Sequence, residues 1–111
     1  MSERQPDFLI EDIIQSITKI FDYTYGLSFE EFTCDSKTID AVIRNFEIIG
    51  EASGRLPEEF KENINTIDWH KIRGFRNRIV HDYMGIDYSI IWTIKNDFLP
   101  QLLSDLTNLK Y

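Results

Sequence analysis

The sequence predicts an all-α protein, a bundle of four to five helices that run up and down. Apolar residues recur at spacings of three and four in several long segments, which is typical of helices that bury one face. Strict alternation of apolar and polar residues between turns is absent, so we expect no sheet. The chain has 111 residues, 42% of them hydrophobic, and this length fits one domain that spans residues 1–111.

The first helix is predicted between about Pro6 and Tyr25. Proline suits a first helical turn, and Gly26 suits the end of a helix. The segment 28–31, Ser-Phe-Glu-Glu, has the pattern of a capping box that opens a further short helical turn. The apolar stripe of this first helix consists of Leu9, Ile10, Ile13, Ile14, Ile17, Ile20 and Phe21.

A second helix is expected to begin after Asp35 or Ser36 and to run to about Ala52, with Gly54 closing it. The small residues near its end indicate that another helix approaches closely there. Its apolar stripe consists of Ile39, Val42, Ile43, Phe46 and Ile49. The segment 56–60 that follows is predicted to be a connector, with at most one helical turn.

The third helix is predicted from Trp69 to about Tyr83. Asp68 is a good N-cap residue because its carboxylate accepts hydrogen bonds from the first free N–H groups. Gly85 ends the helix.

The fourth helix begins at Tyr88, with Asp87 as its cap. Pro100 should kink or interrupt it, because proline lacks an N–H donor and clashes with the preceding turn. Its apolar face consists of Ile90, Ile91, Ile94, Phe98, Leu102, Leu103 and Leu106.

Composition excludes several classes of protein. The single cysteine, Cys34, rules out an internal disulfide and a zinc site made of cysteines alone. No apolar run approaches the roughly 20 residues that span a bilayer, and the N-terminus lacks the features of a signal peptide. We therefore expect a cytoplasmic protein.

The net charge of −7 argues against general adhesion to nucleic acid. Positive charge is nevertheless concentrated in one place. Lys71, Arg73, Arg76 and Arg78 fall within eight positions that contain no acidic residue.

Arg76 conflicts with the pattern of its own helix. At about 100° per residue, it lies at the centre of an apolar stripe whose members all fall within roughly 60° of it. Arginine is rarely buried unless it is paired. Arg76 could extend to the edge of the bundle or pair with a carboxylate such as Glu47 or Asp12; alternatively, the conflict marks a functional site. The stripe consists of Trp69, Ile72, Ile79, Val80 and Tyr83.

A second set of polar residues lies along one flank of the same predicted helix: His70, Gly74, Asn77 and His81, with Arg73 beside them. Histidine transfers protons near neutral pH, and arginine braces phosphate oxygens. Together they suit metal-independent RNA cleavage, in which the ribose 2′-hydroxyl attacks the adjacent phosphate. We expect no metal or other cofactor, because no acidic cluster with metal-ligand spacing accompanies these residues.

The segment from Arg76 to Tyr83 resembles a known motif. Arg76, Asn77 and His81 match the R-N-x-x-x-H signature of the HEPN superfamily, and together with Tyr83 they resemble the R-x4-H-x-Y motif of HepT toxins. The flanking segments 44–52, 68–75, 84–87 and 98–102 are similar as well, so the resemblance covers roughly residues 6–106.

The resemblance implies a HEPN-like ribonuclease toxin that forms a homodimer with the motifs of both chains facing one cleft. Arg76 would bind and polarise the scissile phosphate, and His81 would act as general acid or base. Asn77 would orient a neighbour or the substrate. Arg73 is a candidate contact to the RNA, which could be a tRNA or an mRNA.

The resemblance also implies a partner, a minimal nucleotidyltransferase antitoxin of a type VII-like toxin–antitoxin pair. Such an enzyme transfers an adenylyl group to the motif tyrosine, here Tyr83, and so silences the toxin. An added phosphate there would place bulk and negative charge beside the arginine. Two alternatives stay open: a non-catalytic HEPN module that serves a nucleotidyltransferase, and a plain dimerisation domain.

Overall fold

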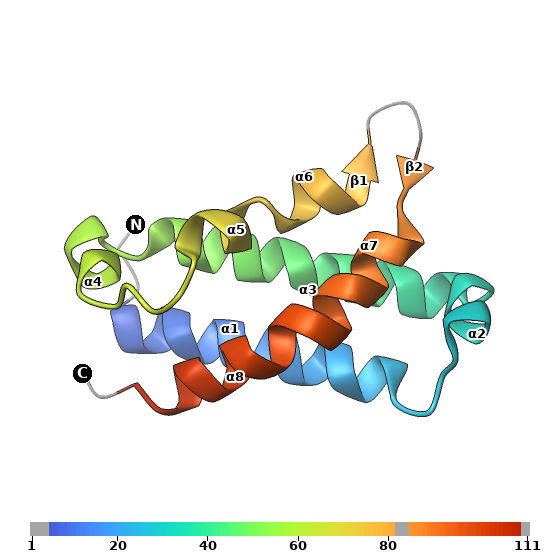
Figure 1. The fold of residues 1–111 in the computed structure, drawn as a ribbon, viewed down its shortest axis with the longest axis horizontal. Coiled ribbons are helices and arrows are strands. Elements are labelled where there is room, and N and C mark those ends of the chain that lie inside the picture. Colours follow the sequence, from blue (N-terminus) through green and yellow to red (C-terminus); the bar gives the residue numbers. More distant parts are fainter. Residues whose placement is uncertain (1–4, 82–84, 110–111) are drawn as a thin grey trace.

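The computed structural model describes residues 5–81 and 85–109, and its centre is a pair of long helices. Helix α1 (Pro6–Thr24) and helix α3 (Ser36–Arg55) lie side by side along the length of the molecule (Figure 1). Their predicted apolar stripes form much of the core: Ile10, Ile13, Ile17, Val42 and Ile49 are fully buried. The all-α prediction is confirmed for these elements.

Local signals place the ends of these helices. After α1, Gly26 adopts a positive φ of 77°, a conformation that favours glycine. The predicted capping box opens α2 (Phe29–Thr33): the Glu31 N–H donates to Ser28 Oγ at 3.1 Å, and the Ser28 N–H donates to Glu31 Oε1 at 2.9 Å. Asp35 caps α3, which continues to Arg55, beyond the predicted end.

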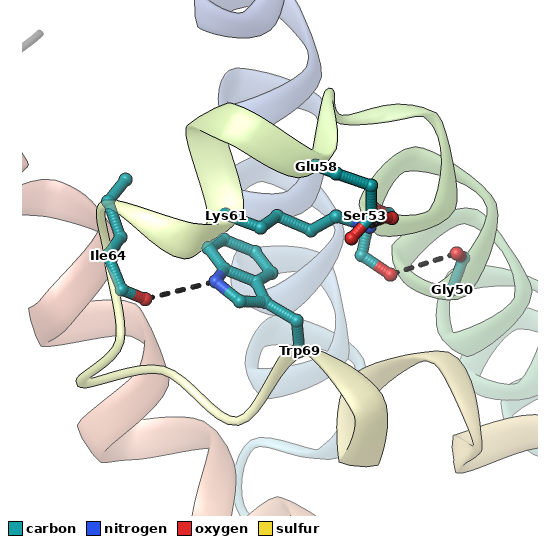
Figure 2. Close-up of polar contacts among 6 residues, drawn as sticks. All are labelled: Gly50, Ser53, Glu58, Lys61, Ile64 and Trp69. Carbon is teal, nitrogen blue, oxygen red and sulfur yellow. Dashed lines mark hydrogen bonds and ion pairs between the residues drawn. The ribbon is translucent and has the colours of Figure 1, made fainter.

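The C-terminal end of α3 is tied to the segment that follows it. In helix α4 (Glu58–Glu62), the buried Lys61 donates from Nζ to the Ser53 carbonyl at 3.3 Å and lies 3.2 Å from Glu58 Oε1. Further along, the Trp69 indole N–H donates to the Ile64 carbonyl at 3.1 Å (Figure 2). These contacts fix the loop that leads into the next helices.

The predicted third helix is broken. The structure has two short helices, α5 (Trp69–Arg73) and α6 (Phe75–Ile79), with Gly74 between them. The prediction of one helix from Trp69 to Tyr83 was therefore wrong. Glycine lowers helix stability by roughly 1 kcal/mol relative to alanine, which explains why the helix breaks at this position. Tyr83 lies outside the described residues.

A small hairpin of two-residue strands, which the helical pattern did not predict, follows α6. Strands β1 (Val80–His81) and β2 (Gly85–Ile86) pair antiparallel, with Val80 opposite Ile86 and His81 opposite Gly85. The β-branched pair favours extended backbone, and the Asp87 N–H donates to the Ile79 carbonyl at 2.7 Å.

The last helical segment runs across the α1–α3 pair (Figure 1). It consists of α7 (Tyr88–Thr93), a π-helical turn η1 (Ile94–Phe98) and α8 (Leu99–Thr107). Asp87 caps it as predicted, accepting from the Ile90 N–H at 3.2 Å. The π turn stands directly before Pro100, which interrupts the regular helix as predicted. The wider turn relieves the clash that a proline ring makes with the carbonyl four residues earlier.

Three phenylalanines join α6 to the rest of the core. The Phe75 ring is fully buried and packs edge-on against Phe46 of α3 and Phe98 of η1, at centroid distances of 5.5 and 5.4 Å. Phe75 therefore sets how α6 lies on α3. In the part of the chain that the structure describes, no helix is both long and apolar enough to cross a membrane.

Candidate functional site

An open groove of about 440 Å³ lies where α5 and α6 meet the C-terminal half of α3. On the α3 side, two rows of residues that are each four positions apart line the groove. On the other side, three residues of the positively charged segment 71–78 line it. The lining residues are Phe46, Glu47, Gly50, Glu51, Gly54, Arg55, Arg73, Arg76 and Asn77.

Arg76 lies on the open side of this groove. Its side chain is 56% exposed, and its Nε lies 3.6 Å from Oε1 of Glu47, whose side chain is 32% exposed. Pairing with Glu47, one of the possibilities predicted for Arg76, is confirmed. Its predicted place at the centre of an apolar stripe was wrong.

The error has a geometric cause. Phe75 is fully buried, although the predicted stripe does not include it. It lies about 100° behind Arg76 on a helical wheel. With Phe75 included, the buried face centres on Ile72, Phe75 and Ile79, all fully buried, and Arg76 falls at its edge.

Arg73 crosses from α5 to α3. A Cβ at Gly54 would lie 3.4 Å from Nε of Arg73, and a Cβ at Gly50 would lie 3.7 Å from the Arg73 carbonyl oxygen. The two glycines therefore allow α5 to approach α3, as the small residues near the end of this helix predicted. This approach brings the guanidinium group of Arg73 into the same groove as that of Arg76.

The residues of the predicted polar flank do not lie on one face of one helix. Asn77 lines the groove, but His70 lies in a separate pocket of about 290 Å³, which shares Arg73 with the groove. His81 is in β1 rather than on a helix, with its Cα opposite that of Gly85. The break at Gly74 and the end of α6 at Ile79 interrupt the helical spacing on which the flank was predicted.

The prediction missed the contribution of α3. Glu47, Glu51 and Arg55 stand four residues apart and share one face of this helix, and all three line the groove. A helical wheel of the second predicted helix would have shown this polar face. Of these three residues, only Glu47 was predicted to lie near Arg76, as one of its two possible partners.

The groove brings together opposite charges in reach of solvent. Three arginines and two glutamates line it, and arginine pairs bind phosphate or carboxylate oxygens through several N–H donors at once. Among residues 5–81 and 85–109, no group of three or more histidine, cysteine, aspartate or glutamate side chains could hold a metal ion. The arrangement is suited to binding an anionic group.

Comparison with protein families decides the class. The model of the HepT-like family, described as ribonuclease HepT-like, matches residues 13–109. The chain belongs to this family. The match includes both sides of the groove as well as the segment from Arg76 to Tyr83.

Individual HepT-like relatives align over nearly the whole chain. A protein of Thermococcus cleftensis named "Probable ribonuclease HepT" is 40% identical over 99% of this chain and 99% of its own length. A relative from Methanocaldococcus jannaschii, whose name is that of an RNase, is 35% identical over 96% of this chain and 88% of its own. A third, from Caldanaerobacter subterraneus subsp. tengcongensis and also named for RNase activity, is 36% identical over 89% and 88%. No solved structure matches the chain significantly.

Proposed function

We propose that this HepT-like protein is a metal-independent endoribonuclease and that the groove between α3 and α5–α6 is its RNA-binding and cleavage site. The observation that carries the proposal is the convergence of Arg73, Arg76 and Asn77 on one groove. These three residues come from two short helices within five positions of the chain. The family membership and the names of the relatives support RNA as the substrate.

Arg76 is the phosphate-binding group. Its ion pair with Glu47 is made through Nε, so this contact leaves the two terminal nitrogens to form a bidentate pair with phosphate oxygens. Negative charge builds up on those oxygens as the phosphate is attacked, and a positioned guanidinium stabilises it. Arg73 is a second contact to the RNA, and Asn77 orients the substrate or a neighbouring side chain.

His81 is the proton-transfer group of the motif. Its place directly after α6, in β1, keeps its backbone close to the helix that carries Arg76. In the homodimer that the family resemblance implies, the motifs of two chains face one cleft. Histidine suits this role because its pKa lies near the pH of the cell.

The test is cleavage of a labelled RNA by the purified protein in the presence of EDTA. Arg76→Ala and His81→Ala should each lower the rate by about 10²- to 10⁴-fold. Arg78→Gln is the matched control, because Arg78 is exposed on α6 but does not line the groove. Equal rates for the wild type and both site variants would reject the proposed site. Intact RNA with every protein, together with tight RNA binding, would support the non-catalytic binding module.

The same proposal includes a regulatory partner. The protein acts in the cytoplasm as the toxin of a toxin–antitoxin pair, and a minimal nucleotidyltransferase silences it by adenylylating Tyr83. Support comes from the match of the Tyr83 segment to the HepT motif. Co-expression with the nucleotidyltransferase, followed by mass spectrometry, should find the mass of AMP on Tyr83 and none on Tyr83→Phe. Unmodified Tyr83 in a silenced protein would instead indicate inhibition by complex formation.

A further inference from the structure

The proposed reaction needs a proton acceptor, and each chain has one motif histidine. Cleavage by the 2′-hydroxyl requires one group to take the proton from that hydroxyl and another to give a proton to the departing 5′-oxygen. The groove also contains two carboxylates, those of Glu47 and Glu51.

We infer that Glu47 is the general base of this groove, a conclusion that rests on the proposed ribonuclease function. Its Oε1 lies 3.6 Å from Nε of Arg76, so a phosphate bound to the terminal nitrogens of that guanidinium group is one guanidinium width away from the carboxylate. The 2′-hydroxyl that attacks this phosphate is on the adjoining ribose and comes within reach of Glu47.

The position of Glu47 is held from both sides. It is in the middle of the 20-residue helix α3, which is packed along α1, and Arg76 is held in place by the burial of its neighbour Phe75 between α3 and η1. A pre-organised carboxylate on a rigid helix meets the geometric requirement for a catalytic base. The other charged groups that line the groove are Glu51 and Arg55 of α3, Arg73 of α5 and Arg76 of α6.

Glu51 is the alternative carboxylate, and the structure favours Glu47 over it. Glu51 lines the same groove one helical turn further on but forms no ion pair with Arg76 among the described residues. It is also exposed, whereas Glu47 is only partly so. The role of proton acceptor is therefore assigned to Glu47, the carboxylate that pairs with the phosphate-binding arginine.

The step balances without a further reactant. O2′ forms a bond to phosphorus and passes its proton to the Glu47 carboxylate, while the bond from phosphorus to O5′ breaks and O5′ takes a proton from His81. The products are a 2′,3′-cyclic phosphate and a 5′-hydroxyl.

A substrate with an activated leaving group separates the two roles. When sulfur replaces the bridging 5′-oxygen of RNA, the thiolate leaves without being protonated, because its pKa is far below that of an alcohol. His81→Ala should therefore recover most of its lost rate on the 5′-thio substrate. Glu47→Gln should stay at least 10²-fold slower than the wild type on both substrates, since removal of the 2′-hydroxyl proton is still required.

The pH dependence of kcat/KM gives a second, independent readout. Glu47→Gln should lose the acidic limb of the profile, which reports the essential base of the free enzyme. Glu51→Gln should retain that limb, and Glu47→Asp should retain it at a lower rate. Circular dichroism and thermal melting establish that each variant is folded.

The outcomes distinguish the role of Glu47 from the proposed ribonuclease function. An acidic limb that persists in Glu47→Gln, or rescue of this variant by the 5′-thio substrate, overturns the assignment of Glu47 while leaving the ribonuclease function intact. If the wild type cleaves neither substrate, the proposed function fails instead.

Discussion

The guanidinium group of Arg73 lies directly over Gly54: a Cβ at residue 54 would be 3.4 Å from its Nε and 3.8 Å from its Cζ. The Arg73 side chain therefore packs directly against residue 54. A small side chain fits there in ordinary van der Waals contact, and a large one does not.

Two substitutions at Gly54 should act in opposite directions. Gly54→Ala should raise the free energy of unfolding by about 0.5–1 kcal/mol, because alanine favours the helix and its methyl group fits. Gly54→Leu should push the Arg73 side chain aside and raise KM for RNA several-fold. Urea denaturation and steady-state cleavage measure the two effects. A Gly54→Leu variant with unchanged KM would show that the position of Arg73 does not matter for RNA binding.

The buried lysine should contribute less to stability than its burial suggests. Lys61 is 7% exposed, but its ion-pair partner Glu58 is 77% exposed, and the Ser53 carbonyl also accepts from the Leu56 N–H. Lys61→Met, which keeps the packing volume, should therefore change the free energy of unfolding by less than about 1 kcal/mol. Lys61→Ala should cost about 2 kcal/mol or more, because it leaves a cavity. Denaturant melts of both variants measure this, and equal losses would contradict the argument from packing.

Stability at low pH should depend on Asp35. The Thr38 hydroxyl and the Thr38 N–H both donate to this carboxylate, at 2.7 and 3.1 Å, and they hold its pKa below the ordinary value of 3.8. A lowered folded-state pKa gives stabilisation that is present above the ordinary pKa and is lost as the pH falls through the lowered value.

Asparagine separates the charge from the cap. Asp35→Asn keeps an acceptor for the Thr38 N–H and should flatten the dependence of the melting temperature on pH below about pH 4, whereas Asp35→Ala should lower the melting temperature throughout. Thermal melts across a pH series are the measurement. A wild-type pH dependence in Asp35→Asn would mean that other carboxylates, such as Glu31, dominate.

Substitution of Phe75 should disturb the position of α6 and therefore that of Arg76, although Phe75 itself does not line the groove. Its ring packs between Phe46 and Phe98, and Phe75→Ala should cost about 3–5 kcal/mol in the free energy of unfolding. Phe75→Leu should cost less and should lower RNA cleavage by more than it lowers RNA binding, because α6 would no longer hold Arg76 precisely. Loss of stability without any change in cleavage at a temperature where the variant is folded would contradict this.

The long helices could be predicted from the sequence because their signals are local. The apolar stripes of α1 and α3, the capping box at Ser28 and the caps at Asp35 and Asp87 depend on neighbours within one or two turns. The split between α5 and α6 could not be predicted in the same way. The split depends on a modest cost at Gly74. The end of α6 at Ile79 is followed by the pairing of Val80 with Ile86, a contact that helical periodicity does not report.

The site could be predicted only in part, because its two sides come from separate segments of the chain. The motif pointed to Arg76 and Asn77, and the structure places both at one groove. The groove itself is formed by α5 resting on Gly50 and Gly54, which is a tertiary contact between segments some 20 positions apart. The sequence could therefore suggest Glu47 and Asp12 as partners of Arg76, but it could not show that Glu47 forms the ion pair.

The most direct test of metal-independent RNA cleavage compares two oligonucleotides of one sequence, all-ribose and all-2′-deoxyribose, with the wild-type protein and Arg76→Ala in EDTA. Only the ribose strand should be cut, and its product should end in a 2′,3′-cyclic phosphate by mass spectrometry. Arg76→Ala should lower the rate by at least 10²-fold. Cleavage of the deoxyribose strand, or cleavage that requires an added divalent cation, would contradict the proposal.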